Sequence, residues 1–283
     1  MAKVGFVGLG NMGSVLAGNL VGAGHDVVAY DMAGPERSPE GAAFAVDVTE
    51  LAGRADVVVL SLPDGDVSER VAVEIARAPE RRVTVVVDTS TIGVSAAQAV
   101  EGLLGEAGLS YVDAPVSGGV AGARARTLSV MYAGQEAACR VAEPVLAGLS
   151  DRRRRVGDRP GMAQALKLAN NFLSATALAA TSEAIAFGLS VGLDMATMIE
   201  VIDGSSGQSA ATSDKFPNHV LTGRYGAGFA NSLMAKDLKL YLGAVESQGV
   251  QAALGRVTEG VWDRFASEEP GADFTRIYPF VAR

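Results

Sequence analysis

The sequence predicts an α/β protein with a doubly wound parallel sheet, followed by a long helix and an all-helical C-terminal domain. Three observations predict this fold class. Short runs of Val, Leu and Ile alternate with helix-length segments over about the first 150 residues. A glycine-rich turn follows the first run directly. Beyond residue 160 the pattern is helical throughout. We therefore expect two domains, residues 1–159 and 160–283.

The predicted strands are short and lack polar alternation, which is typical of strands buried on both faces of a parallel sheet. They are Lys3–Val7, Asp26–Tyr30, Asp56–Leu60, Thr84–Asp88, Ser110–Ala114 and Leu128–Ala133. The predicted helices of this half are Met12–Ala23, Asp64–Ala78, Ser95–Gly108 and Glu136–Leu149. Strand–helix–strand repetition of this kind favours right-handed crossovers that cover both faces of the sheet.

The second half opens on a long helical segment, Pro160–Leu189, with no glycine between Gly161 and Gly188. About 30 residues at 1.5 Å each give roughly 45 Å, more than one small domain needs, so we expect this helix to join two domains. We expect Pro160 to begin it, because proline's missing N–H costs nothing in a first turn. Further helices are predicted from the cap Asp194 to Asp203, and over Ser232–Ser247 and Ala252–Ala266.

The composition excludes several classes of function. The chain has 283 residues, 48% of them hydrophobic, which is enough to bury a core. A formal net charge of −8 argues against nucleic-acid or membrane partners, because both require basic surfaces. One cysteine, Cys139, excludes an internal disulfide, and two histidines exclude a histidine-rich metal site, so no metal is predicted. The arginines at 152–155 are interpreted as a solvated edge.

No targeting segment or membrane span is predicted. Lys3 leads directly into an apolar run far too short for a signal peptide. The longest apolar stretch, Leu166–Leu193, contains Lys167, two asparagines and Glu183, which does not fit a membrane span. The expected location is therefore the cytoplasm.

The glycine-rich turn has the spacing Gly8-x-Gly10-x-x-Gly13 between the first predicted strand and helix. Such a turn lets the backbone approach a pyrophosphate at a helix N-terminus, although a glycine-rich turn without a ligand is the alternative. Asp31 follows Gly10 by 21 residues, where an acid receives the adenosine ribose hydroxyls. A carboxylate there favours NAD, but Arg37 could accommodate a 2′-phosphate, so NADP stays possible.

A second glycine-containing segment follows the predicted strand at 110–114. Ser117, Gly118 and Gly119 leave their backbone N–H groups unobstructed by large side chains, which suits a carboxylate ligand. Ligands of open parallel sheets bind just outside the carboxyl ends of the strands. From the residues alone, a plain turn is an equal alternative.

Lysine is scarce in this chain, with five lysines against nineteen arginines. A buried lysine can lose its proton, whereas a guanidinium stays protonated. Lys167 lies in the long helix, and Asn171 and Ser174 share its face because they follow by four and seven residues. This polar strip on an apolar helix indicates either a functional site or a structural hydrogen-bond network.

Several motifs in order resemble one family, the β-hydroxyacid dehydrogenases, which include 3-hydroxyisobutyrate dehydrogenases and tartronate semialdehyde reductases. The likeness extends over nearly the whole chain. The motifs are Gly5-Phe-Val-Gly8-Leu-Gly10-Asn-Met-Gly13, Leu62-Pro63, Asp88-Thr-Ser90-Thr91, Asp113-Ala-Pro-Val-Ser-Gly-Gly119, Lys167-Leu-Ala-Asn170-Asn171, Glu183-Ala184, and Phe229 with Lys236-Asp237-Leu238.

The resemblance implies a Rossmann-type domain, a connecting helix and an all-helical domain that often builds a dimer. It implies that Lys167 is the catalytic lysine and that Lys236 lies near the nicotinamide and substrate. The substrate carboxylate would be bound by Ser117, Gly118, Gly119 and Asn171. The dinucleotide would be held by Gly8, Leu9, Gly10, Asn11, Met12, Gly13, Asp31, Leu62, Pro63 and Thr91.

Three positions depart from the family pattern. Arg126 stands where the family usually has glycine, and we expect it to add charge and bulk beside the proposed carboxylate loop. The segment Gly157–Ala163 carries one extra residue, and its Gly-x-Gly is altered to Gly161-Met162-Ala163. Val94 occupies a usual proline. The first two departures affect the expected substrate more than the reaction class.

The leading hypothesis is an NAD-dependent oxidoreductase that oxidises a small β-hydroxy acid, or reduces its semialdehyde, with Lys167 as general acid/base. One alternative is a catalytically inactive NAD-binding module that presents a surface to a partner. Another is an imine reductase-like relative, against which Lys167 argues. The apolar C-terminal helices suggest a homodimer or homotetramer.

Overall fold

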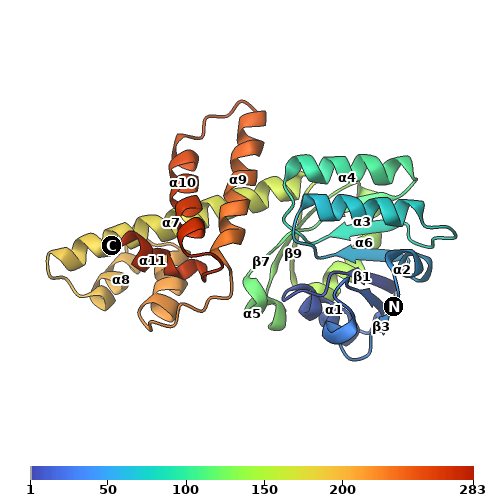
Figure 1. Ribbon diagram of the computed structural model, residues 1–283, viewed down its shortest axis with the longest axis horizontal. Coiled ribbons are helices and arrows are strands. Elements are labelled where there is room, and N and C mark those ends of the chain that lie inside the picture. The colour runs from blue at the N-terminus through green and yellow to red at the C-terminus, as the bar shows by residue number, and fades with distance from the viewer. Residues whose placement is uncertain (1) are drawn as a thin grey trace. The chain divides into compact units, whose positions relative to one another are not determined.

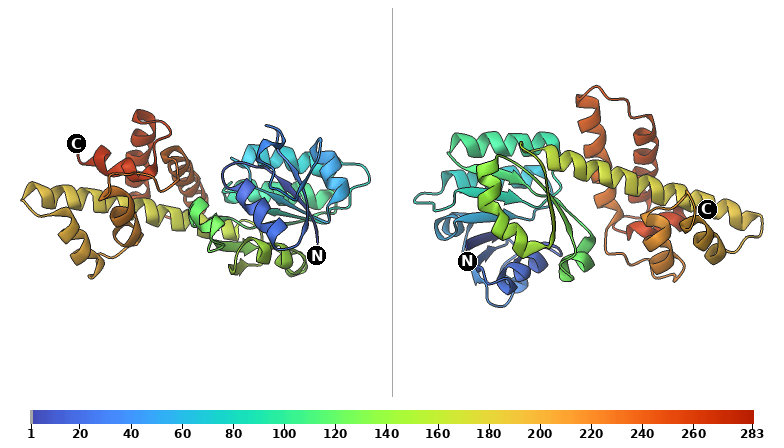
Figure 2. Two further views of the ribbon diagram at one scale, coloured as in Figure 1. Left: turned by 90° about the horizontal axis from the view of Figure 1, so that it is seen from below. Right: turned by 180° about the vertical axis from the view of Figure 1, so that it is seen from behind.

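A computed structural model describes residues 2–283, and the chain divides after Lys167 into two compact units. The first is an α/β unit, and the second is built of helices. Figure 1 labels most of the helices and several strands, and Figure 2 gives two further views. The mixed α/β class and the helical C-terminal region predicted from the sequence are confirmed.

Nine strands form one sheet within the described residues of the α/β unit, in the order β3-β2-β1-β4-β5-β6-β8-β7, with β9 paired to β8. Strands β1 to β6 pair in parallel, whereas β8 runs antiparallel to β6 and β7. The first six strands have the doubly wound order, whose switch point lies between β1 and β4. The strands are β1 Lys3–Val7, β2 Asp26–Tyr30, β3 Ala43–Phe44, β4 Val57–Leu60, β5 Val85–Asp88, β6 Ser110–Asp113, β7 Val116–Ser117, β8 Ser129–Ala133 and β9 Arg152–Gly157.

Helices cover both faces of this sheet. Helices α1 and α6 pack with one apolar cluster, which includes Leu16 and Leu146. Helices α2, α3 and α4 pack with the other, which includes Leu51, Ile75 and Leu104. Burial on both sides is the physical reason for the apolar strand sequences. The helices are α1 Gly13–Gly22, α2 Val48–Arg54, α3 Gly65–Arg77, α4 Val94–Glu106, α5 Gly119–Arg124 and α6 Glu136–Leu149, with a 3₁₀ turn η1 at Pro35–Arg37.

The arginine-rich segment forms a strand that the sequence analysis did not predict. β9 pairs in parallel with β8, from Arg152 opposite Ser129 to Gly157 opposite Ala133. Within it, Arg153 Nε donates to Glu143 Oε1 at 2.6 Å, and Arg155 donates to the carbonyl of Gly134 at 3.1 Å. Charged side chains of this kind are tolerated on an edge strand, which pairs with a neighbour on one side.

The long helix α7 spans Met162–Ser190, so it begins two residues after Pro160, and the prediction that Pro160 begins it is wrong. The backbone N–H groups of Gly161 and Gln164 both donate to Asp113 Oδ2, at 3.0 and 2.9 Å. This carboxylate at the end of β6 satisfies donors that every helix N-terminus leaves without an intrahelical partner. Asp113, at the end of another element, therefore caps the start of α7.

By length and composition, α7 is the one helix in the described residues that could cross a membrane. Core helices pass the same test. The first turn of α7 is hydrogen-bonded to the α/β unit. Farther along, Ala175, Leu178 and Ile185 belong to the core of the helical unit. α7 therefore contributes side chains and hydrogen bonds to the packed interior of the chain.

The helical unit is built around aromatic side chains. Trp262 and Phe265 pack edge to face at its centre, 5.9 Å between ring centroids. Phe172 of α7 stacks on Tyr241 of α9 at 4.5 Å. Helices α9 and α10 lie side by side in Figures 1 and 2. Besides α7, the elements are α8 Met195–Asp203, a π-helix η2 Ala211–Val220, α9 Asn231–Ser247, α10 Ala253–Glu268, a 3₁₀ turn η3 Phe274–Arg276 and α11 Ile277–Val281.

The predicted helix cap at Asp194 is confirmed, because its carboxylate accepts a hydrogen bond from the backbone N–H of Thr197 at 2.9 Å. The π-helix η2 was not predicted. It contains Pro217, which cannot donate to a helical ladder, so a helical periodicity is hard to recognise there from the sequence.

Candidate functional site

The glycine turn links β1 to α1, and two of its three glycines are required by close packing. An added Cβ on Gly8 would collide with the carbonyl of Ser61, and one on Gly13 would collide with the carbonyl of Gly8. Gly8 also has φ +96°, which favours glycine. At Gly10, an added Cβ would meet no described atom within 4 Å. Gly8 and Gly13 are therefore required by packing, whereas Gly10 leaves room for a ligand to approach.

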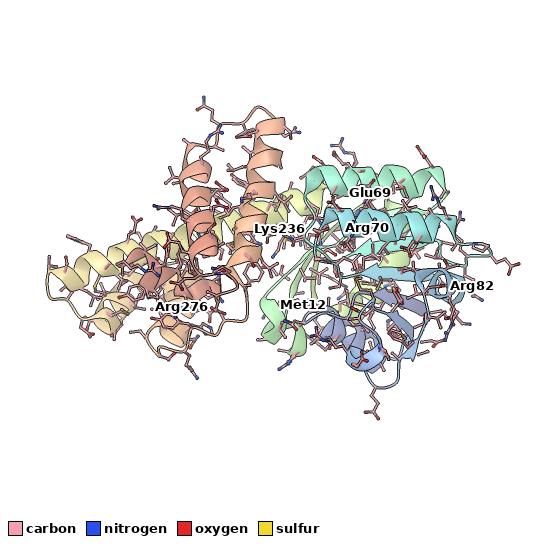
Figure 3. All side chains as sticks on the ribbon, viewed as in Figure 1. Met12, Glu69, Arg70, Arg82, Lys236 and Arg276 are labelled. Carbon is pink, nitrogen blue, oxygen red and sulfur yellow. The ribbon has the colours of Figure 1, made fainter. Side chains whose placement is uncertain are left out.

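The N-terminus of α1 follows this turn directly. Met12 lies at the start of the helix (Figure 3), where residues 2–283 provide neither a side-chain cap nor an acidic residue in the first turn. The N–H groups of such a terminus attract an anion. The residues from Gly8 to Gly13, predicted to hold the dinucleotide, thus form one turn that leads into the uncapped N-terminus of α1.

Asp31 contacts the glycine turn from the end of β2. Its Oδ2 accepts from the backbone N–H of Leu9 at 2.5 Å, and its Oδ1 accepts from that of Ala33 at 2.8 Å. The structure therefore brings Asp31 beside the turn, as the spacing predicts.

The loops after β4 and β5 are joined through Ser90. Its Oγ accepts from the backbone N–H of Leu62 at 2.8 Å, and its own N–H donates to Asp88 Oδ1 at 2.9 Å. Leu62 and Pro63 lie on the first of these loops and Thr91 on the second. Predicted cofactor residues therefore follow β1, β2, β4 and β5, which are neighbours in the sheet.

Two carboxyl groups lie side by side at the ends of β5 and β6. Asp88 and Asp113 are partners in the strand register, and both are fully buried. Burial raises the pKa of Asp88 and raises the pKa of Asp113 to about 7, although hydrogen bonds from Gln164 and Gly161 oppose the shift of Asp113. The Tyr111 hydroxyl donates to Asp88 Oδ2 at 3.4 Å. The sequence analysis gave neither acid a role.

The first two turns of α7 carry two buried polar side chains. Gln164 is fully buried and hydrogen-bonds the loop after β5. Lys167 follows one turn later and is 7% exposed. The sequence analysis identified Lys167 but not Gln164. The available indication was that Gln164 is a lone polar residue among Met162, Ala163 and Leu166.

The segment after β6 forms the turn proposed to bind a carboxylate. Ser117 ends β7, and Gly118 and Gly119 have φ values of +129° and +65°. An added Cβ on Gly119 would meet no described atom within 4 Å. The two glycines are thus required by the backbone conformation, and the turn leaves space beside Gly119.

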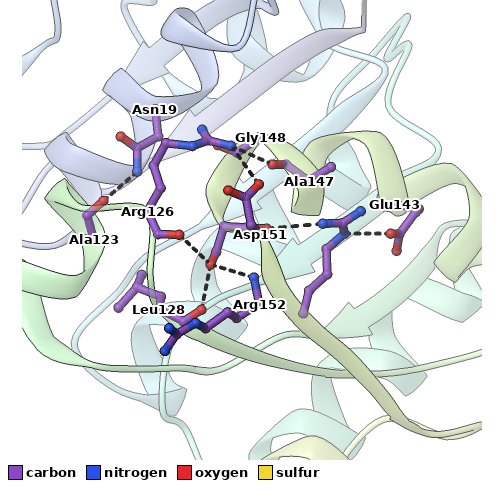
Figure 4. A network of polar contacts seen from close by, with 11 residues as sticks. Asn19, Ala123, Arg126, Leu128, Glu143, Ala147, Gly148, Asp151 and Arg152 are labelled. Carbon is purple, nitrogen blue, oxygen red and sulfur yellow. Dashed lines mark hydrogen bonds and ion pairs between the residues drawn. The ribbon is translucent and has the colours of Figure 1, made fainter.

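Arg126 does not extend over this turn, which corrects the expectation that it adds charge there. Its guanidinium donates to the carbonyls of Gly148 and Ala147, at 2.6 and 3.0 Å, and lies 3.7 Å from Asp151 (Figure 4). These carbonyls belong to the last turn of α6, where a cation is favourable. Arg126 has φ +57°, which explains why glycine also suits the position.

Two other departures from the family pattern contact each other. Gly161 has φ +91°, and an added Cβ there would lie 3.2 Å from Val94 Cγ1. Val94 is the first residue of α4. The altered segment before α7 and the altered start of α4 therefore pack as one unit.

In the helical unit, Asp237 brings together two residues that the sequence places far apart. Asn171 Nδ2 donates to Asp237 Oδ2 at 2.6 Å. Lys236 Nζ lies 3.5 Å from Asp237 Oδ1, and Figure 3 labels Lys236 on α9. Asp237 is 3% exposed, so both contacts are made to a buried carboxyl group. The sequence analysis quoted Asp237 in a motif but gave it no role.

Comparisons with known proteins agree with this geometry. A family model described as the NAD binding domain of 6-phosphogluconate dehydrogenase matches residues 3–157. A second, described as NAD-binding of NADP-dependent 3-hydroxyisobutyrate dehydrogenase, matches residues 161–281. A probable 3-hydroxyisobutyrate dehydrogenase of Mycobacterium tuberculosis is 37% identical, over 98% of this chain and 97% of that protein.

Solved structures are also similar over nearly the whole chain. The 3-hydroxyisobutyrate dehydrogenase of Mycobacterium tuberculosis with L-serine has a TM-score of 0.93 at 35% identity, covering 99% of both chains. The structure of Psf3 in complex with NADP+ and 2-OPP has a TM-score of 0.84 at 27% identity, covering 98% of this chain and 99% of that one.

The raised pKa of Asp113 predicts a pH-dependent stability. Because the pKa is about 7 in the folded protein and about 3.8 in an unfolded chain, the folded state binds more protons between these values. The free energy of unfolding therefore falls as pH rises through this range. Asp113→Asn removes this titration. We expect the free energy of unfolding, variant minus wild type, to rise by about 2 kcal/mol between pH 5 and pH 8 in urea titrations.

Asp194→Asn is the matched control. Hydrogen bonds from Thr197 lower the pKa of Asp194, so this group is ionised throughout the same pH range. The difference between this variant and the wild type should not change from pH 5 to pH 8. An equally constant difference for Asp113→Asn would show that Asp113 does not titrate between pH 5 and pH 8 and contradict the prediction.

Proposed function

The chain belongs to the β-hydroxyacid dehydrogenase family, and from this premise we propose that it oxidises the alcohol of a small β-hydroxy acid with a nicotinamide cofactor, or reduces the matching semialdehyde. The observation that carries the proposal is Lys167. It is a buried amine at the start of α7, in a chain that supplies most of its positive charge with arginine.

The α/β unit fits a dinucleotide on three observations: the space at Gly10, the N-terminus of α1, and the carboxylate of Asp31. The turn from Gly8 to Gly13 would bind the pyrophosphate, and Asp31 the adenosine ribose. Leu62, Pro63 and Thr91 would contact the rest of the dinucleotide. When bound, the nicotinamide accepts the hydride that leaves the carbinol carbon.

Lys167 is proposed to move the second hydrogen of the alcohol. In the oxidative direction its amine takes the hydroxyl proton as the carbonyl forms, and in the reductive direction its ammonium returns that proton. Lysine suits this exchange because a guanidinium stays protonated. The two hydrogens of the alcohol are thus divided between the cofactor and Lys167.

The proposed substrate carries a carboxylate beside the alcohol. Ser117, Gly118 and Gly119 would bind it through their turn, and the family resemblance implies the same role for Asn171 and Lys236. Asp237 supports this role, because it contacts both of the latter side chains. The Mycobacterium tuberculosis relative was solved with L-serine, a small molecule with a carboxylate and a β-hydroxyl group. This resemblance supports the substrate class. It does not identify the group on the third carbon of the substrate.

Removing the amine of Lys167 tests the proposed chemistry. Lys167→Ala should lose at least about a hundredfold in kcat on the best of a panel of short β-hydroxy acids, because positioned proton transfer is typically worth about 10²–10⁴-fold. Its Kd for NAD, measured by cofactor fluorescence, should stay close to that of the wild type. Lys239→Ala, an exposed lysine paired with Asp263, is the control and should keep full activity.

The other outcomes of this experiment separate the alternatives. A Lys167→Ala variant with near wild-type turnover would contradict the assignment of Lys167. Saturable NAD binding by the wild type without turnover of any hydroxy acid would favour an inactive binding module. Turnover of cyclic imines in place of hydroxy acids would favour an imine reductase-like relative.

The proposed cofactor is NAD, because the Asp31 carboxylate pairs with a ribose 2′-hydroxyl and repels a 2′-phosphate. We expect kcat/KM to be at least about tenfold higher with NAD than with NADP, which corresponds to about 1.4 kcal/mol. Asp31→Ser should narrow this ratio, whereas Glu36→Ser, which removes an exposed carboxylate nearby, should leave it unchanged. Equal or better use of NADP by the wild type would overturn the preference.

We also propose that the chain forms a homodimer or homotetramer through its helical unit. This unit leaves several large apolar side chains more than half exposed, and such surfaces mark contacts between subunits. They are Leu173, Phe187, Val191, Leu193, Val201, Val250, Leu254 and Val257.

Light scattering tests the assembly. At micromolar concentration the mass should be two or four times the 29.0 kDa of the chain. Phe187→Glu should shift the mass towards the monomer, because a carboxylate would be buried in the contact. Val46→Glu introduces the same carboxylate at an exposed apolar position of the α/β unit and should leave the mass unchanged. A wild-type mass of 29.0 kDa would contradict the proposal.

A further inference from the structure

Gln164 is a fully buried side chain whose polar atoms all have partners. Its Oε1 accepts from the backbone N–H groups of Ile92 and Gly93, at 3.0 and 3.1 Å. Its Nε2 donates to the carbonyl of Ser90 at 3.0 Å. The carboxamide therefore binds the loop 90–93 in both directions, as an acceptor and as a donor.

The same loop is fixed to the loop after β4. Ser90 Oγ accepts from the backbone N–H of Leu62, and the N–H of Ser90 donates to the buried Asp88. These two loops carry Leu62, Pro63 and Thr91, the residues proposed to contact the dinucleotide. Gln164 thus connects the start of α7 to the proposed cofactor loops.

The backbone of Gln164 is held as firmly as its side chain. Its N–H donates to Asp113 Oδ2, which also accepts from the N–H of Gly161. Lys167 follows Gln164 by three residues, a rise of about 4.5 Å along the helix. A shift or rotation of this first turn would therefore displace Lys167 by a similar amount.

We propose that Gln164 is a positioning residue, which fixes the distance between Lys167 and the cofactor loops by binding the loop 90–93 to the first turn of α7. This inference rests on the proposed function. Misplacement by about 1 Å can cost on the order of a hundredfold in rate, so a small rotation of this turn is enough to impair catalysis.

Few side chains can replace the carboxamide. The loop presents two donors and one acceptor, and a carboxamide of this length provides the complementary acceptor and donor. A glutamate has the same shape but places a second acceptor against the carbonyl of Ser90, where it cannot donate when ionised. An alanine leaves all three backbone groups without this partner, which is costly for buried groups.

Kinetic measurements on Gln164→Glu and Gln164→Ala test the proposal. We expect kcat to fall at least about tenfold in both, with the KM for NAD and the KM for the hydroxy acid changing less than about threefold. With substrate deuterated at the carbinol carbon, the isotope effect on kcat should rise, because hydride transfer becomes rate-limiting. A smaller folded fraction also lowers the apparent kcat at constant KM, but it leaves the isotope effect unchanged, so the isotope effect distinguishes the two causes.

Arg81→Ala is the matched control. Arg81 also donates to two backbone carbonyls of the α/β unit, those of Ala76 and Ala107, where α3 and α4 end. Its loss should lower the unfolding midpoint but leave kcat per folded molecule and the isotope effect unchanged. Unfolding midpoints are measured first, and all rates are taken well below them. Gln164→Ala adds no buried charge, so it keeps the test available if Gln164→Glu does not fold.

The outcomes separate this inference from the proposed function. Gln164 variants with wild-type kcat and isotope effect, beside an inactive Lys167→Ala, would overturn the positioning role and leave the function intact. An active Lys167→Ala would overturn the function instead. A fall of kcat in the Arg81→Ala control equal to that in the Gln164 variants would also overturn the positioning role, since any weakening of the unit would then produce it.

Discussion

The start of α7 depends on one buried carboxylate. Asp113 ends β6 and accepts hydrogen bonds from Gly161 and Gln164, so the sheet itself determines where the longest helix begins. Because an α-helix has a fixed rise and rotation per residue, this contact also determines where Lys167 lies with respect to the strand ends. The two loops that follow β4 and β5 and the start of α7, which carries the proposed proton-transfer group, are thereby parts of one hydrogen-bonded unit.

This arrangement has a cost in stability. Asp88 and Asp113 are neighbours in the strand register and both are fully buried, and burial disfavours their charged forms. Hydrogen bonds from Ser90 and Gln164 offset part of this cost. Apolar residues at positions 88 and 113 would avoid the cost of burying two carboxyl groups. They would, however, leave the backbone donors of the loop after β5 and of the first turn of α7 without acceptors. Buried hydrogen bonds of this kind favour a single arrangement of the groups they join.

Much of the fold could be predicted from the sequence, because its signals are local. Strands such as Lys3–Val7 are apolar runs bounded by turns, and Glu136–Leu149 is amphipathic over its whole length. The features that the sequence did not predict depend on contacts between distant segments. The segment Arg152–Gly157 is a strand because β8 offers it an edge, which no local pattern of arginines reveals. The start of α7 and the direction of Arg126 depend on acceptors at Asp113 and at the end of α6, each distant in sequence. Of the candidate site, the spacing placed Asp31 at the glycine turn, but Gln164 and Asp237 act through partners that only the folded chain brings near.

The proposed role of Lys167 is tested most directly by a crystal structure with NAD and a slowly oxidised β-hydroxy acid bound together. The account predicts Lys167 Nζ within about 2.6–3.2 Å of the hydroxyl oxygen, the range required for direct proton transfer. An amine outside that range, with another protein group bonded to the hydroxyl in its place, would contradict it.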